Sequence, residues 1–157
     1  MNDNNLTVNE DKLRGSLFSV TQSLDELIGG NVTLSVLESA LQGHDDLLEQ
    51  LSLLNASDSS LEALSHIERF IIDQALDIYS SANSDSQKDQ IIERFAHHLL
   101  AVEGIGPATA RHLFEAGIAY PDDLFDLTTT DIENLSLPTA SKARILALHE
   151  HHHSQGD

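Results

Sequence analysis

The stretch with the clearest chemical potential is the glycine-rich turn inside Leu99–Ala116, LLAVEGIGPATARHLFEA. Gly104 and Gly106 flank one apolar residue, so the backbone can adopt angles closed to other residues and a ligand can approach it without meeting a Cβ. Pro107 suits the first turn of a helix, so the spacing predicts a helix, a tight turn and a second helix. The amides that open a helix have no acceptor within it and lie at the positive end of its dipole. The turn is therefore predicted to hold an anionic oxygen, such as that of a phosphate.

These residues resemble the helix-hairpin-helix family, whose motif reads apolar-Gly-apolar-Gly-x-x-x-Ala-x-x-apolar. The residues at or next to the motif positions are Val102, Gly104, Ile105, Gly106, Ala110 and Leu113. The resemblance implies main-chain contacts to the sugar-phosphate backbone of DNA, made without reading sequence, in repair, recombination or replication. The DNA-backbone site that it implies comprises Gly104, Ile105, Gly106, Pro107, Ala108 and Thr109, with Arg111 as a side-chain supplement.

Family members with tandem motifs join two hairpins through a short connector helix, and the downstream sequence fits that plan. Gly117 suits the end of the helix that follows the first hairpin, and Pro121 and Thr130 suit the starts of two short helices. The arrangement is similar to the tandem units of excinuclease, branch-migration and Ski2-like helicase proteins, and to the C-terminal domain of the bacterial RNA polymerase alpha subunit. The resemblance covers about residues 88–150, and nothing before residue 86 resembles a known family.

The segment Leu135–Leu146, LSLPTASKARIL, occupies the place of a second hairpin. Ser136 and Pro138 stand where the family has glycines, so close approach of the backbone to phosphate is not expected there. Contact with a DNA backbone at this hairpin would depend on the side chains of Lys142 and Arg144.

The histidine-rich run HEHHH at residues 149–153 contains the string HExxH, with which zinc proteases place two ligands on one helical face. No downstream ligand follows it, so we interpret the run as the exposed polar end of the last helix, where imidazoles suit the negative end of the dipole. Any nickel or zinc bound there would be adventitious. No metal site and no cofactor are therefore predicted.

Other patterns that imitate catalysis have simpler explanations. The carboxylate pairs Asp45-Asp46 and Asp122-Asp123 are each expected at the start of a helix, where the dipole favours acids. Cysteine is absent, and the sequence has no P-loop, nucleophile elbow or dinucleotide-binding fingerprint. We therefore expect a protein that is not an enzyme.

The elements that position these residues follow from apolar spacing, which has the helical period throughout. One helix is expected from about residue 9 to Ile28. A second begins after Thr33 and is interrupted at Gly43, so that the stretch to Leu54 forms either two short helices or one kinked helix. A capping box at Ser59 and Glu62 opens a helix that runs to about Tyr79.

The stretch 80–87, SSANSDSQ, has no large apolar residue and is interpreted as a linker. The expected fold is all-α: an acidic, leucine-rich helical bundle with its linker over residues 1–85, then a tandem helix-hairpin-helix domain over 86–157 with a histidine-rich end.

Composition limits the functions that this chain can have. Its 157 residues include 8 Lys+Arg against 26 Asp+Glu, a formal charge of -18, which excludes coating of DNA by bulk electrostatics. Only 4% of residues are aromatic and leucine is abundant, a composition that suits helices. No apolar run approaches the roughly 18 residues of a membrane span, and the polar N-terminus lacks the apolar region of a signal peptide, so a cytoplasmic protein without membrane contact is expected.

Three functional hypotheses follow. In the first, the protein is an accessory factor that binds DNA weakly and without sequence preference, or binds a DNA-processing protein. In the second, it is an acidic adaptor in which the hairpin domain is architectural and the N-terminal helices hold a basic partner or a second copy. In the third, the acidic bundle mimics DNA and occupies the site of a DNA-binding protein.

Overall fold

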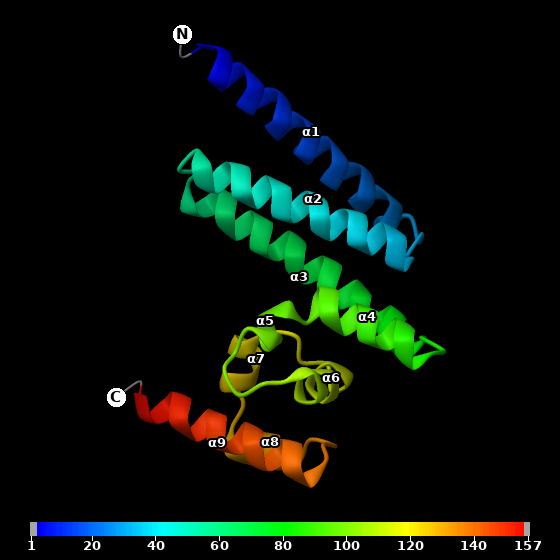
Figure 1. Ribbon diagram of the computed structural model, residues 1–157, viewed down its shortest axis with the longest axis vertical. Helices are drawn as coiled ribbons and strands as arrows, with labels where there is room; N and C mark the ends of the chain where they lie inside the picture. The colour runs from blue at the N-terminus through cyan, green and yellow to red at the C-terminus, as the bar shows by residue number, and fades with distance from the viewer. Residues whose placement is uncertain (1–2, 156–157) are drawn as a thin grey trace. The chain divides into compact units, whose positions relative to one another are not determined.

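A computed structural model describes the backbone of residues 3–155 and the side chains of residues 10–155 (Figure 1). Every regular element in that range is a helix, which confirms the all-α prediction. The chain divides into two compact units, Met1–Ile78 and Tyr79–Asp157. The division falls before the linker that the sequence indicates.

Unit 1 contains the first two helices, α1 (Asp3–Ile28) and α2 (Leu34–Leu53), and most of α3 (Asp58–Ser80). Gly30, with φ +95°, follows α1 in the left-handed conformation expected of a helix stop. Thr33 caps α2 as predicted, because its hydroxyl accepts a hydrogen bond from the Val36 amide at 3.3 Å. The predicted capping box at Ser59 is wrong, because α3 begins at Asp58 and the Ser57 hydroxyl accepts from the Ser60 amide instead.

Of the two alternatives at Gly43, two short helices are wrong, since α2 is a single helix that runs through this residue. A Cβ at Gly43 would lie 2.8 Å from Val20 Cγ2 and 3.3 Å from the Val20 amide nitrogen. The glycine therefore serves the close approach of α1 to α2 and not the end of a helix. As a consequence Asp45 and Asp46 lie in the middle of α2, and their interpretation as helix-start acids is wrong.

The core of unit 1 is aliphatic. Its buried apolar side chains from the first three helices are Val20, Leu27, Leu37, Ala40, Leu41, Leu47, Leu64, Ile71, Ile72 and Ala75. The same helices also leave large apolar side chains in solvent, namely Leu17, Phe18, Ile28, Leu48, Leu53 and Leu54. No other large hydrophobic side chain in the described part of the chain is as exposed as these six.

Unit 2 is built from short helices after the end of α3: α4 (Asp85–Phe95), α5 (His97–Leu100), α6 (Pro107–Glu115), α7 (Pro121–Phe125), α8 (Thr129–Glu133) and α9 (Thr139–Gln155). The stretch interpreted as a linker is partly helical, because the Ser84 hydroxyl accepts from the Gln87 amide and caps α4. Gly117, with φ +86°, follows α6 as expected. Thr128 and Asp131 form a capping box that opens α8. The core of this unit includes Phe95, Leu99, Leu113, Phe114, Leu124, Ile132 and Ile145.

The close approach at Gly43 generates a stability prediction. Gly43→Ala should lower the free energy of unfolding by about 1–2 kcal/mol, because the added methyl overpacks against the stiff side chain of Val20. Gly15→Ala is the matched control: Gly15 is exposed in α1 with no atom within 4 Å of its Cβ position, so alanine should raise stability by up to about 1 kcal/mol. Urea unfolding followed by circular dichroism measures both. Equal stabilisation by the two substitutions would contradict the close approach.

Candidate nucleic-acid interface

The predicted tight turn is present between α5 and α6. The Val102 amide donates to the Leu99 carbonyl, and the Ile105 amide donates to the Val102 carbonyl, both at 3.1 Å. Gly104 has φ +95°, a left-handed conformation that favours glycine. Ile105 is 4% exposed, so it is buried as the motif implies. The predicted order of a helix, a tight turn and a second helix is therefore confirmed.

The two glycines of the turn serve different purposes. Gly104 combines its positive φ with close packing, because a Cβ there would lie 3.0 Å from Leu148 Cδ2 on α9. Gly106 has an extended backbone, φ -90° and ψ 178°, which any residue can adopt, and no atom lies within 4 Å of its Cβ position. Gly104 is therefore needed for the fold, whereas Gly106 leaves open space beside the start of α6.

The start of α6 presents main-chain donors. Gly106 is its N-cap, and no side chain caps the helix there. Pro107 has no amide hydrogen, and the Ala110 amide donates to the Gly106 carbonyl at 2.9 Å, so the first-turn amides without an acceptor in the helix are those of Ala108 and Thr109. Pro107 and Ala108 are exposed, while the Thr109 side chain is buried. This end of α6 has the form of a backbone anion site.

Arg111, predicted to supplement that site, is engaged within unit 2. Its Nη2 lies 3.0 Å from Asp85 Oδ1, its Nη1 3.4 Å from Asp89 Oδ1 and its Nε 3.7 Å from Glu115 Oε1. Nε also donates to the hydroxyl of Tyr79 at 3.2 Å, and the Arg111 side chain is 28% exposed. Three carboxylates around one cation leave no net positive charge for a phosphate.

The other predicted cations lie on or near the start of α9. Lys142 Nζ donates to the Glu133 carbonyl at 2.7 Å, which satisfies an acceptor at the end of α8. Arg144 is exposed, and no ion pair or hydrogen bond to it is found among residues 3–155. Of the three basic side chains, Arg144 is the one whose charge is directly available.

A cavity of about 700 Å³ lies between α4 and α6 and adds negative charge to this region. Its wall carries the carboxylates of Asp89, Glu93 and Glu115, and Pro107 and Ala108 line it at the start of α6. An anion that approached the Ala108 amide along this cavity would meet these carboxylates. The side of the α6 N-terminus near Gly106 is therefore the favourable approach.

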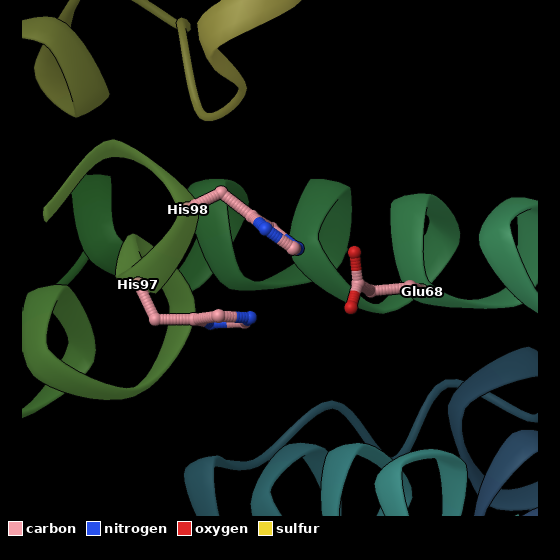
Figure 2. A group of neighbouring side chains, drawn as sticks. All are labelled: Glu68, His97 and His98. Carbon is pink, nitrogen blue, oxygen red and sulfur yellow. The ribbon is translucent and has the colours of Figure 1, made fainter. Parts of the chain in front are cut away.

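Aromatic and imidazole rings support the helix that leads into the turn. Figure 2 shows His97 and His98 on α5, with ring centroids 4.1 Å apart. His98 also stacks on Tyr120 at 5.2 Å, and His97 Nδ1 lies 3.1 Å from the Arg94 carbonyl oxygen. These contacts join α5 to the segment before α7 and to the end of α4.

The histidine-rich run is not wholly the exposed polar end that the sequence suggests. His149 is 8% exposed and donates through Nε2 to the Leu127 carbonyl at 2.6 Å. His153 Nε2 lies 3.0 Å from the Phe125 carbonyl oxygen, and the His152 ring stacks on Phe125 at 4.0 Å. The prediction is wrong for His149, because the bend after α7 offers a carbonyl acceptor that only the tertiary fold brings near α9.

Comparison with protein-family models, with curated proteins and with solved structures gives no match to this chain. The helix-hairpin-helix resemblance therefore depends on the motif residues and the turn that they form. None of the helices in the described range is both long enough and apolar enough to pass through a bilayer.

The Arg111 network generates a titration prediction for Tyr79. Burial raises the pKa of Tyr79 above its ordinary value of 10.0; a hydrogen bond from its hydroxyl to Glu115 Oε1 at 2.9 Å raises it further, and Arg111 lowers it. Glu115→Gln should therefore lower the Tyr79 pKa, because the phenolate would no longer face a carboxylate. Ultraviolet absorbance titration of tyrosinate in a Tyr120→Phe background measures it.

The control for this titration is Glu103→Gln, which removes an exposed carboxylate from the turn before α6. It should leave the Tyr79 curve in place. Identical curves for Glu115→Gln and the parent would show that the Tyr79–Glu115 hydrogen bond does not form in solution.

Proposed function

We propose that this protein is a non-enzymatic accessory factor whose C-terminal unit binds the DNA backbone without sequence preference. The contacts are made by main-chain amides at the start of α6, with residues 104–109 as the contact segment. The single observation that carries the proposal is the uncapped N-terminus of α6, where Gly106 leaves open space beside the amides of Ala108 and Thr109. The motif resemblance supplies the chemical class of the ligand.

Charge determines the strength of such binding. A chain with a formal charge of -18 is repelled from DNA at long range, and Arg111 is neutralised by its carboxylate partners. Arg144, and Lys142 to the extent that its ammonium remains accessible, are left to contact phosphates. We therefore expect weak binding, with an affinity that falls as added salt reduces the gain from counterion release.

The test uses fluorescence anisotropy with labelled duplex, branched and single-stranded DNA, from about 50 to 200 mM salt. Gly106→Ser is the informative variant, because a serine hydroxyl at the N-cap accepts from the amides of the first turn and so competes with phosphate. Affinity should fall about tenfold, since a hydrogen bond to a charged group contributes about 1.5–3 kcal/mol. Helicity should be unchanged, because the backbone at Gly106 is already extended.

Ala116→Ser is the matched control, since it adds the same hydroxyl at the exposed opposite end of α6 and should retain binding. Arg144→Gln should reduce the slope of log affinity against log salt by about one. Gly104→Val is not a clean variant, because its positive φ and its contact with Leu148 make misfolding the expected result. Absence of DNA binding by the parent protein at about 50 mM salt, where weak phosphate contacts still register, rejects the proposal.

A second candidate function is an acidic adaptor that binds a basic protein. The observation that favours it is the exposure of large apolar side chains on α1, with Phe18 at 70% and its neighbour Leu17 at 53%. Residues 1–95 contain 17 acids and 5 bases, so their formal charge of 5 - 17 = -12 would steer a basic partner towards these side chains. Loss of a basic partner on Phe18→Ser, in a protein that does not bind DNA, would favour this function.

A further inference from the structure

A cluster of metal-ligating side chains lies in unit 1, away from the hairpin. His44 and Asp45 are consecutive in α2. Glu68 projects from α3 (Figure 2). His44 Nδ1 lies 3.0 Å from Asp45 Oδ1 and 3.9 Å from Glu68 Oε2, and one ligand atom from each residue falls within 4.8 Å of the others. We propose that these three side chains bind one divalent transition-metal ion.

Burial makes the cluster unusual for an ordinary ion pair. His44 is 2% exposed and Glu68 is 8% exposed, so an imidazole and a carboxylate both lie in the interior. Two carboxylates and a neutral imidazole together carry a charge of -2, which matches the charge of a divalent cation.

The geometry suits direct coordination. Transition-metal bonds to imidazole nitrogen and carboxylate oxygen are about 2.0–2.2 Å long, so two ligand atoms on one ion lie roughly 3–4 Å apart. The two separations from His44 Nδ1, 3.0 Å to Asp45 Oδ1 and 3.9 Å to Glu68 Oε2, fall in that range. The Asp45 side chain is 48% exposed, so the ion has a path from solvent and room for water as a further ligand.

The ligand set indicates the class of ion. One imidazole nitrogen with two carboxylate oxygens and no thiolate suits Zn²⁺, Mn²⁺, Fe²⁺ or Co²⁺ better than an all-oxygen ion such as Ca²⁺. Zn²⁺ is commonly bound in proteins by histidine nitrogen together with aspartate or glutamate oxygen. Zn²⁺ is therefore the first ion to test, with Co²⁺ as a spectroscopic reporter of coordination.

The experiment is calorimetric titration of the full chain with Zn²⁺. The exposed histidines 151–153 are first changed to Gln, so that the C-terminal run does not add binding. The parent should bind one equivalent at the proposed site, its thermal midpoint should rise with Zn²⁺, and Co²⁺ should give absorption bands of a nitrogen- and oxygen-ligated ion. Asp45→Asn, at a half-exposed position that leaves the core intact, should weaken this binding at least tenfold; His44→Gln and Glu68→Gln should abolish it.

Asp46→Asn and His66→Gln are matched controls on the same two helices, since both residues are exposed and outside the cluster. They should leave the affinity unchanged. Folding of each variant is checked by circular dichroism, and the Asp45 variant decides the matter if the two buried substitutions unfold. Zn²⁺ affinity that survives Asp45→Asn or His44→Gln in a folded chain overturns the proposal. Failure here would leave the hairpin proposal intact, because the DNA measurement does not involve these residues.

Discussion

Eight lysine and arginine side chains are set against 26 carboxylates in this chain, and the fold engages two of these cations, Arg111 and Lys142, internally. Arg111 joins the start of α4 to α6 through Asp85 and Asp89, and Lys142 joins the end of α8 to α9. A cation that neutralises carboxylates between helices cannot also neutralise a phosphate at full strength. Scarcity of positive charge therefore limits both the stability of unit 2 and the ligands that it can attract.

The same scarcity explains why main-chain amides carry the proposed contact with DNA. A peptide amide carries a partial positive charge whatever the side chains are, and at the start of a helix it is oriented outward. Gly106 leaves these amides uncapped, where a serine or aspartate would have satisfied one of them. On this proposal, recognition of an anion by the hairpin does not draw on the few basic residues of the chain.

Local chemistry let the sequence predict the all-α fold, the cap at Thr33 and the turn at Gly104, because each depends on residues within a few positions of one another. Predictions that depended on distant partners failed. A glycine such as Gly43 is typical of a helix end, but here it is required because Val20 of another helix packs directly against it. His149 has the composition of a solvated helix end, but a carbonyl 22 positions earlier accepts its hydrogen.

The cluster at His44 was missed for the same reason: Asp45 was assigned to a helix start that does not exist, and Glu68 lies far away in the sequence. The signal that could have indicated it was a histidine on the apolar face of α2, next to a carboxylate. Only the tertiary structure shows that a glutamate on α3 lies beside that face.

The contact between Gly43 and Val20 has a mechanical consequence for the first two helices. One turn of a helix advances about 5.4 Å along its axis. If α1 slid along α2 by one turn, Val20 would leave Gly43, the only glycine of α2, and would press against a residue that has a side chain. Intermediate shifts meet the same steric barrier. The glycine therefore acts as a notch that fixes the register of the pair, and slippage between these helices requires them first to separate.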